Sequence, residues 1–359
     1  MVKQDLIGRR IVLIGGAGFI GHNLALELKK RGAEVSVVDG LQVNNLLSLH
    51  GDMGANVERD LYLSIISERL DLLRAAGIPL YVEDARDYLR LSLLIGRLNP
   101  QVIVLLAAVA HAARSNKDPF HTFDHSFRTL ENALDIARDQ VEHFIYFSSS
   151  MVYGNFEGNA VTEETVCNPL GIYGALKFGG EKLVIAYNQV FNLPYTIVRP
   201  SSLYGERCIS RRVGQVFIEN ALRGRDLSIQ GDGNETLDFT YIDDLVNGVC
   251  ACIEQPASKN QTLNLTFGRG RSLNEVAAIV KEEFPDIKVK HVTREALMPE
   301  RGTLCVDKAR KLIGYEPQFP LEVGYRRYIE WYRGLFERMN AKAQMSAVLQ
   351  LTGWLCLAV

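Results

Sequence analysis

An apolar run that ends in three evenly spaced glycines, near the start of the chain, constrains the fold more than any other feature. Residues 9–21 read RRIVLIGGAGFIG, with glycines at positions 15, 18 and 21. The run predicts a buried strand, and apolar residues in 19–31 recur at helical spacing. A strand, a tight glycine turn and a helix N-terminus form a cradle for a pyrophosphate, because backbone N–H groups face the anion and no Cβ atom obstructs it. The alternative is a glycine turn without any ligand.

An acidic residue at the end of the next strand extends this pattern. Residues 33–38 predict a second strand, which leads into Asp39. A carboxylate there suits the hydroxyls of an adenosine ribose and repels a 2′-phosphate. No Arg or Lys follows in 40–50. The sequence therefore favours NAD over NADP as the cofactor.

Strand and helix patterns alternate through the first 200 residues. Predicted strands cover 9–15, 33–39, 79–84, 101–108, 143–150 and 194–200, and predicted helices cover 18–31, 61–76, 86–97, 118–139 and 173–191. Residues 102–106 are apolar without alternation, as a sheet covered by helices on both faces requires. The predicted fold class is α/β, with a doubly wound parallel sheet that binds ligands at the carboxyl ends of its strands.

The pattern changes after Pro200. We expect residues 1–200 and about 236–262 to form the dinucleotide-binding domain, with 237–254 returning to the sheet as one more strand and helix. Residues 201–235 and 263–335 are expected to form a smaller, discontinuous C-terminal substrate domain over the carboxyl edge of the sheet. Residues 340–359 are a tail of uncertain role. Residues 343–359 are apolar but short for a membrane span, which favours a packed terminal helix.

Composition argues against several kinds of partner. The 359 residues carry a formal net charge of −2, so a nucleic-acid-binding surface is not expected. The six cysteines show no Cys-x-x-Cys or zinc-finger spacing, and no signal-peptide pattern is present. These features favour a cytoplasmic protein with reduced thiols and no membrane partner.

Two side chains that could move a proton lie four residues apart after the fifth predicted strand. Tyr173 and Lys177 fall on one face of a helix. A neighbouring ammonium favours the phenolate, which brings a tyrosine with an ordinary pKa of about 10 into working range. The fifth strand ends in three serines at 148–150, where a hydroxyl can bond the substrate oxygen that loses its proton. The alternative is an exposed amphipathic helix beside a serine-rich turn.

Further motifs follow the glycine turn in a fixed order along residues 7–335. They are Asp39, Leu106-Ala-Ala108, Ser149, Tyr153-Gly154, Tyr173 with Lys177, Arg199-Pro200, Tyr204-Gly205, Gly231-Asp-Gly233, the run 238–244 (DFTYIDD), Asp307-Lys-Ala-Arg310 and Gly314-Tyr315. Together they resemble the extended short-chain dehydrogenase/reductases of the NAD-dependent nucleotide-sugar epimerase/dehydratase family.

The resemblance implies a Rossmann-like fold, tightly held NAD, a nucleotide-diphosphate sugar as substrate and a homodimer. It implies a catalytic triad of Ser149, Tyr173 and Lys177. The cofactor positions that follow are Gly15, Gly18, Phe19, Ile20, Gly21, Asp39, Asp84, Ala85, Ala107, Ala108, Val109, Tyr173, Lys177 and Pro200. The expected substrate positions are Ser149, Ser150, Ser202, Arg211, Arg212 and Arg301.

The chain departs from the family pattern at two places that bear on function. Family 4,6-dehydratases carry an Asp-Glu pair after the catalytic hydroxyl, whereas this chain has Ser150 and Met151, and a methionine cannot transfer a proton. Many UDP-hexose epimerases hold the diphosphate with an Asn and an Arg, at whose places Ser202 and Leu237 stand. Because a buried pyrophosphate without cationic partners is costly, we expect Arg211, Arg212 or, first of all, Arg301 to hold it. Alternatively, Arg211 and Arg212 only begin the solvated helix 213–223.

The leading interpretation is a nucleotide-sugar epimerase that transfers hydride at C4 and passes through a 4-keto sugar. One alternative is a C4 dehydrogenase that releases the keto sugar, for example from a GDP-heptose. A 4,6-dehydratase and a non-catalytic NAD-binding regulator are less favoured. No metal site is expected, because His121 and His125 lack a third ligand at motif spacing. Cys208 is interpreted as a buried inert thiol, although it could line the sugar pocket.

Overall fold

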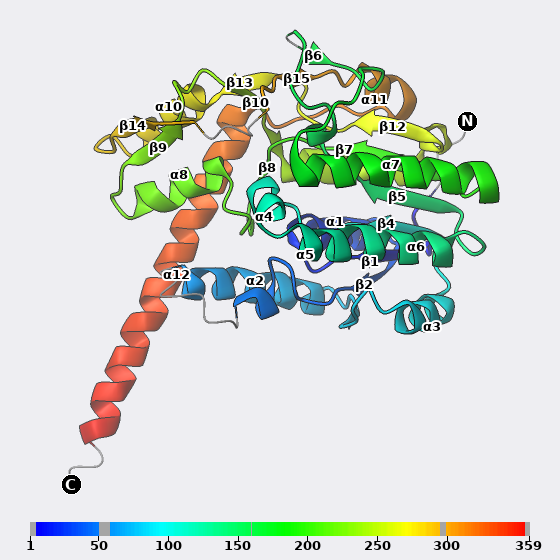
Figure 1. Cartoon of the computed structure of the whole chain (residues 1–359). Coiled ribbons are helices and arrows are strands. Elements are labelled where there is room, and N and C mark those ends of the chain that lie inside the picture. Colours follow the sequence, from blue (N-terminus) through cyan, green and yellow to red (C-terminus); the bar gives the residue numbers. More distant parts are fainter. Residues whose placement is uncertain (1–4, 50–57, 159, 295–298, 356–359) are drawn as a thin grey trace.

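A seven-stranded parallel sheet forms the centre of the molecule (Figure 1). The computed structural model describes residues 5–49, 58–158, 160–294 and 299–355. The order across the sheet is β3-β2-β1-β4-β5-β7-β12. These strands are β1 (Arg10–Ile14), β2 (Glu34–Val38), β3 (Leu80–Tyr81), β4 (Val102–Leu105), β5 (His143–Phe147), β7 (Tyr195–Arg199) and β12 (Gln261–Asn264). The order reverses at β1 and β4, as in a doubly wound sheet, so the predicted fold class is confirmed.

Helices cover both faces of this sheet and enclose two hydrophobic clusters. On one face lie α1 (Phe19–Lys30), α2 (Arg59–Ala75) and α9 (Ile242–Glu254). On the other face lie α3 (Tyr88–Leu98), α6 (Thr129–Ala137) and α7 (Gly171–Phe191). Strand β4 is buried along its whole length, which explains its uninterrupted apolar sequence. The shorter helices are η1 (Leu46–Leu49), α4 (Ala112–Lys117), α5 (Pro119–Phe123), η2 (Asp124–Arg128), η3 (Ser150–Val152) and η4 (Pro256–Ser258).

The remaining residues build a second region from short strand pairs and four helices. The pairs are β6 (Ala160–Val161) with β15 (Thr303–Leu304), β8 (Leu203–Tyr204) with β11 (Thr240–Tyr241), β9 (Leu227–Gln230) with β14 (Val289–Val292), and β10 (Thr236–Asp238) with β13 (Gly270–Ser272). The helices are α8 (Val213–Leu222), α10 (Leu273–Glu283), α11 (Asp307–Ile313) and α12 (Leu321–Leu355).

One predicted element is placed differently. Residues 237–254 were expected to add a strand and a helix to the main sheet, but only the helix, α9, returns, and it packs against α1. Asp238 accepts hydrogen bonds from the backbone N–H groups of Gly268 and Leu304, which holds β10 in the second region. The seventh strand of the sheet is β12 instead.

Buried tyrosines hold helix α12 against α8 within the second region. Tyr325 donates to the carbonyl of Gly214 at 2.6 Å, and Tyr332 donates to Glu219 Oε1 at 2.8 Å. The C-terminal part of α12 extends away from the body of the molecule (Figure 1), so the predicted terminal segment is helical up to Leu355. Within the described ranges, no helix has the length and apolar content needed to cross a membrane.

Candidate active site

A cavity of ≈ 640 Å³ lies where the carboxyl ends of the central strands meet the second region. Its wall includes the glycine turn, the residues that follow β4, β5 and β7, and parts of β9 and β10. Nearly all of the predicted site residues line it: Gly15, Gly18, Phe19, Ile20, Gly21, Asp39, Asp84, Ala85, Ala107, Ala108, Ser149, Ser150, Tyr173, Lys177, Pro200, Ser202, Arg211, Arg212 and Arg301. Val109 does not line it; this residue is buried, and its backbone N–H donates to Ser126 Oγ at 3.1 Å.

The glycine turn fits a diphosphate because neighbouring backbone leaves no room for side chains. Gly15 has a φ of +84°, and a Cβ atom there would lie 2.5 Å from the amide nitrogen of Ala107. A Cβ atom at Gly21 would lie 2.5 Å from Gly16 Cα. Helix α1 begins at Phe19 without a side-chain cap, which leaves its first N–H groups available to an anion.

Asp39 holds the glycine turn and lies at the end of the cavity beside β2, where the adenosine is predicted to bind. Its carboxylate accepts hydrogen bonds from the backbone N–H groups of Ala17 at 3.0 Å and Leu41 at 2.8 Å. Burial raises the pKa of Asp39, and these bonds and the charge of Arg69 act against the rise. Arg69 comes from α2 and was not predicted, since no local pattern links it to Asp39. Its guanidinium donates to the carbonyls of Arg207 and Asn44.

Asp84 is a second carboxylate at this end of the cavity. Burial alone would raise the pKa of Asp84, but hydrogen bonds from Arg86 and Gln42 outweigh it and hold the pKa below its usual range. The shortest of these bonds joins Arg86 Nη2 to Asp84 Oδ2 at 2.6 Å. Asp84 is therefore a carboxylate at neutral pH, and both of its oxygens already accept hydrogen bonds from protein donors.

The two histidines considered as a metal pair lie on α5 and η2, with ring centres 4.0 Å apart. Burial, and secondly the charge of Arg86, lowers the pKa of His125 to about 4, so this ring is neutral at neutral pH. Within the described part of the chain, no three His, Cys, Asp or Glu side chains gather into a metal-binding group.

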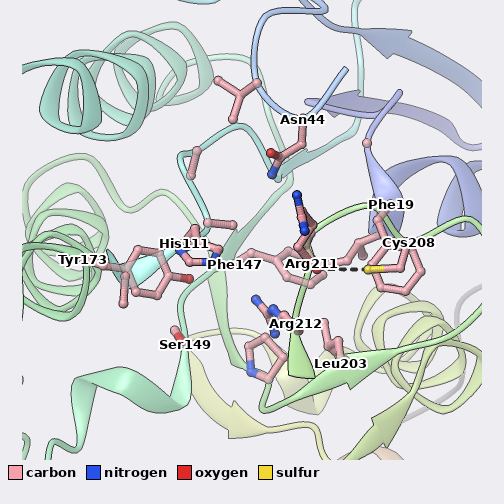
Figure 2. A pocket seen from close by; sticks show the side chains of 18 of the residues that line it. Phe19, Asn44, His111, Phe147, Ser149, Tyr173, Leu203, Cys208, Arg211 and Arg212 are labelled. Carbon is pink, nitrogen blue, oxygen red and sulfur yellow. Dashed lines mark hydrogen bonds between the residues drawn. The ribbon is translucent and has the colours of Figure 1, made fainter. Parts of the chain in front are cut away.

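Ser149, at the start of η3, and Tyr173, on α7, direct their hydroxyl groups towards each other on one side of the cavity (Figure 2). Ser149 Oγ accepts a hydrogen bond from the backbone N–H of Met151 at 3.2 Å, which fixes the hydroxyl at the start of η3. Burial raises the pKa of Tyr173, whereas the charge of Arg212 and a hydrogen bond with Ser149 act in the opposite direction. The site thus holds a tyrosine whose ionisation depends on its immediate neighbours.

Lys177 shares the buried face of α7 with Tyr173. The spacing predicted that its ammonium acts on Tyr173, whereas its hydrogen bond is with the backbone of β5. Its Nζ donates to the carbonyl of Phe147 at 2.6 Å and lies 5.0 Å from the centre of the Tyr146 ring. Burial lowers the pKa of Lys177 to about 8, and the charge of Glu181 opposes this shift. The cation that acts on the pKa of Tyr173 is Arg212.

Glu181, one further helical turn along α7, was missed by the sequence analysis although it repeats the four-residue spacing. It accepts a hydrogen bond from Ser148 Oγ at 2.5 Å and from two nitrogens of Arg199 at 2.7 and 2.9 Å. Arg199 also stacks on the ring of Tyr153 at 4.8 Å. This buried network fixes the end of β5 behind the predicted catalytic side chains.

Three arginines of the second region line the cavity, and Figure 2 labels two of them. Arg212 points towards Tyr173 and Ser149, whereas Arg211 points towards Phe19 and Asn44. The Nε atom of Arg301 is buried without a hydrogen-bond partner, and burial lowers the pKa of this guanidinium to about 10.

Some lining residues carried little or no sequence signal. His111 precedes α4 and lies near Tyr173 in Figure 2. Gln230 Oε1 is a buried acceptor without a partner in the wall of the cavity. Cys208 is buried, as expected, and also lines the cavity, with its Sγ 3.0 Å from Ser210 Oγ. Leu237, at the place of the usual arginine, is a buried lining residue as well.

Known proteins resemble this chain over most of its length. The model of the NAD dependent epimerase/dehydratase family matches residues 11–266. The uncharacterized UDP-glucose epimerase YtcB of Bacillus subtilis is 29% identical over 332 residues, which cover 91% of this chain and 99% of that protein. A UDP-glucuronate 4-epimerase of Thermodesulfobacterium geofontis is 26% identical and covers 92% and 98%. The crystal structure of a UDP-glucose 4-epimerase of Thermotoga maritima with UDP-glucose has a TM-score of 0.79 at 25% identity, covering 91% and 99%.

Proposed function

This chain belongs to the NAD-dependent epimerase/dehydratase family, and we propose that it inverts C4 of a nucleotide-diphosphate sugar through a 4-keto intermediate. It is an enzyme and its cofactor is NAD. The observation that carries the proposal is the convergence of Ser149, Tyr173 and Lys177 on the cavity that also contains the glycine turn.

The chemistry follows from the groups in this cavity. The glycine turn, Asp39 and Lys177 would hold NAD, which would supply a reversible hydride acceptor. Tyr173 as phenolate removes the proton of the C4 hydroxyl, and Ser149 donates a hydrogen bond to the same oxygen. The oxygen becomes a carbonyl as C4 loses its hydride. Return of the hydride to the opposite face of C4, with the proton returned by Tyr173, completes the inversion.

Retention of the keto sugar separates an epimerase from a C4 dehydrogenase, so it is part of the test. A 4,6-dehydratase is disfavoured by Met151, which stands where an acid is needed to eliminate water.

The purified protein is incubated with UDP-glucose, UDP-galactose, UDP-glucuronate and UDP-galacturonate, and the sugar protons are followed by NMR. We expect the C4 epimer to accumulate without added NAD. Accumulation of a keto sugar with reduced cofactor, or no change in any sugar, would contradict the proposal.

We also propose a homodimer, supported by the exposed aromatic residues on α5. Phe120 is 85% exposed and Phe123 is 46% exposed, beside α7. Large exposed apolar side chains of this kind are typical of a protein interface. Light scattering of the wild type should give twice the chain mass, and Phe120→Glu with Phe123→Glu should give one chain mass. A monomeric wild type at micromolar concentration would contradict this assignment.

We further propose that the protein is cytoplasmic. The substrate and cofactor classes and the free cysteines support this location.

A further inference from the structure

Three of the four arginines that line the cavity differ from the paired arginines of the described interior in having no protein partner for their side chains. Arg199 pairs with Glu181, and Arg69 donates to backbone carbonyls. By contrast, no hydrogen bond or ion pair joins the side chains of Arg211, Arg212 and Arg301 to any residue that the structure describes. Arg211 is exposed, whereas Arg212 and Arg301 are half-buried. Because a cation partly removed from water is costly without a counter-charge, the last two point to anionic ligands.

The acidic residues of the cavity do not balance these charges. Asp39, Glu83 and Asp84 follow β2 and β3, at the end of the cavity away from Tyr173. Glu235 lines the other end, where it forms an ion pair with Arg294 at 3.6 Å and its charge also acts on Arg301, so one carboxylate faces several arginines. Lys177 adds a further positive charge beside the reacting centre. The substrate itself must therefore bring the negative charge to this end of the cavity.

The position of Arg212 indicates which part of the substrate it faces. Its charge acts on both Tyr173 and Arg301, and Figure 2 shows it directed towards Tyr173 and Ser149. Tyr173 must face the C4 oxygen, and in a pyranose ring C1, which carries the diphosphate, lies opposite C4. A cation beside the C4 base therefore faces the groups next to C4, among them the substituent at C6.

We propose that Arg212 binds a carboxylate at C6 of the sugar, so that the substrate is a nucleotide-diphosphate hexuronate. A planar guanidinium forms two parallel hydrogen bonds with a carboxylate, whereas a C6 hydroxyl leaves the charge uncompensated. Arg301 then remains for the diphosphate. This inference rests on the proposed nucleotide-sugar function and assigns a specificity role to Arg212.

The test measures binding of UDP-glucuronate and UDP-glucose to the NAD-loaded protein by calorimetry. The wild type should bind UDP-glucuronate at least tenfold more tightly than UDP-glucose. Arg212→Gln should weaken UDP-glucuronate by roughly 10- to 100-fold, the scale of a charge-assisted hydrogen bond, and change UDP-glucose by less than about threefold. Arg301→Gln should weaken both ligands by similar factors. Arg225→Gln, at an exposed position outside the cavity, is the matched control for loss of one arginine.

The outcomes separate this inference from the function on which it rests. Equal or tighter binding of UDP-glucose by the wild type overturns the carboxylate assignment, even if C4 is inverted. Equal losses for both ligands in Arg212→Gln also overturn it, and would place Arg212 on the diphosphate or on Tyr173. Selective binding of UDP-glucuronate that depends on Arg212, without any inversion at C4, supports the inference and rejects the proposed function. Arg212→Lys, which keeps the charge, provides a second variant if the glutamine variant does not fold.

Discussion

The phenolic oxygen of Tyr173 is the atom on which the proposed proton transfer depends. Tyr173→Phe removes that oxygen and leaves the ring in place, so the protein should fold and retain NAD. Turnover should fall at least ~10²-fold, the scale of a lost general base. Tyr187→Phe, on the same helix and outside the cavity, is the control. Turnover of Tyr173→Phe within about threefold of the wild type, measured by NMR, would contradict the assignment.

Glu181 controls a second proton at the site, that of Lys177. The ammonium exists below the Lys177 pKa of about 8, so activity that needs this charge declines as the pH rises through that value. The charge of Glu181 raises this pKa. In Glu181→Gln, the alkaline limb of the kcat/KM profile should therefore move to lower pH, by about 1 unit.

A second measurement separates an effect of Glu181 on the pKa of Lys177 from an effect on the stability of the fold. Loss of the ion pair with Arg199 also lowers thermal stability, so the melting temperature is measured beside the pH profile. Glu164→Gln, at an 88% exposed side chain, controls for loss of one carboxylate. A lower melting temperature with an unmoved alkaline limb would show that Glu181 only stabilises the fold.

Residue types and spacings were enough to predict that the glycine cradle, Ser149 and Tyr173 would share one cavity. They could not predict contacts between residues distant in sequence. Arg69 acts on Asp39 from α2, and the Nζ of Lys177 turns to the carbonyl of Phe147. Both depend on how α2 and α7 pack against the sheet, which no local pattern encodes.

At the scale of elements, the turn between β1 and α1 leaves no room for a side chain at Gly15. Gly15→Ala places a Cβ atom 2.5 Å from the backbone nitrogen of Ala107, at a φ of +84° that an alanine rarely adopts. The variant should lose bound NAD, measured by absorbance of the released cofactor, and should melt at a lower temperature. Gly96→Ala in α3 is the matched control, because nothing lies within 4 Å of its Cβ position.

The two glycine variants should change the stability of the protein in opposite directions. In Gly96→Ala, helix propensity predicts a gain in stability of up to ~1 kcal/mol with NAD unchanged. Retention of NAD by Gly15→Ala at the wild-type level would show that the turn can shift away from Ala107, and that the close approach is not needed for cofactor binding.

The strands of the main sheet were predicted correctly where the hydrophobic pattern was strong. The prediction was wrong where contacts between residues distant in sequence determine which strands pair. The six strands predicted in the first 200 residues all join the sheet, and the apolar runs of β4, β5 and β7 are buried along their whole length. The two short strands within 236–241, β10 and β11, pair with β13 and β8 instead of the main sheet. Hydrogen bonds to Asp238 from distant backbone groups decide this placement.

At the scale of the whole molecule, α12 connects parts that are far apart in the sequence. Tyr332 and Tyr62 of α2 both donate to Glu219 of α8, so three helices meet at one buried carboxylate. Burial raises the pKa of Glu219, whereas the hydrogen bonds from these side chains and Gln215 act against the rise. The wall of the cavity formed by α8 therefore depends on the first half of α12.

We expect the fold to need the first part of α12 and not its C-terminal part. Among the side chains of α12 whose burial the structure describes, the last buried one is Leu335, and the end of the helix extends away from the body (Figure 1). A variant that ends after Ala341 should keep its melting temperature within ~2 °C and its activity within about twofold. A variant that ends after Glu330 loses Tyr332 and Leu335 and should be destabilised by at least ~3 kcal/mol, the scale of removing a buried aromatic side chain. Calorimetry with NAD bound measures both, and a large loss of stability in the longer variant would show that the extended part of α12 packs in solution, for example against a second copy of the chain.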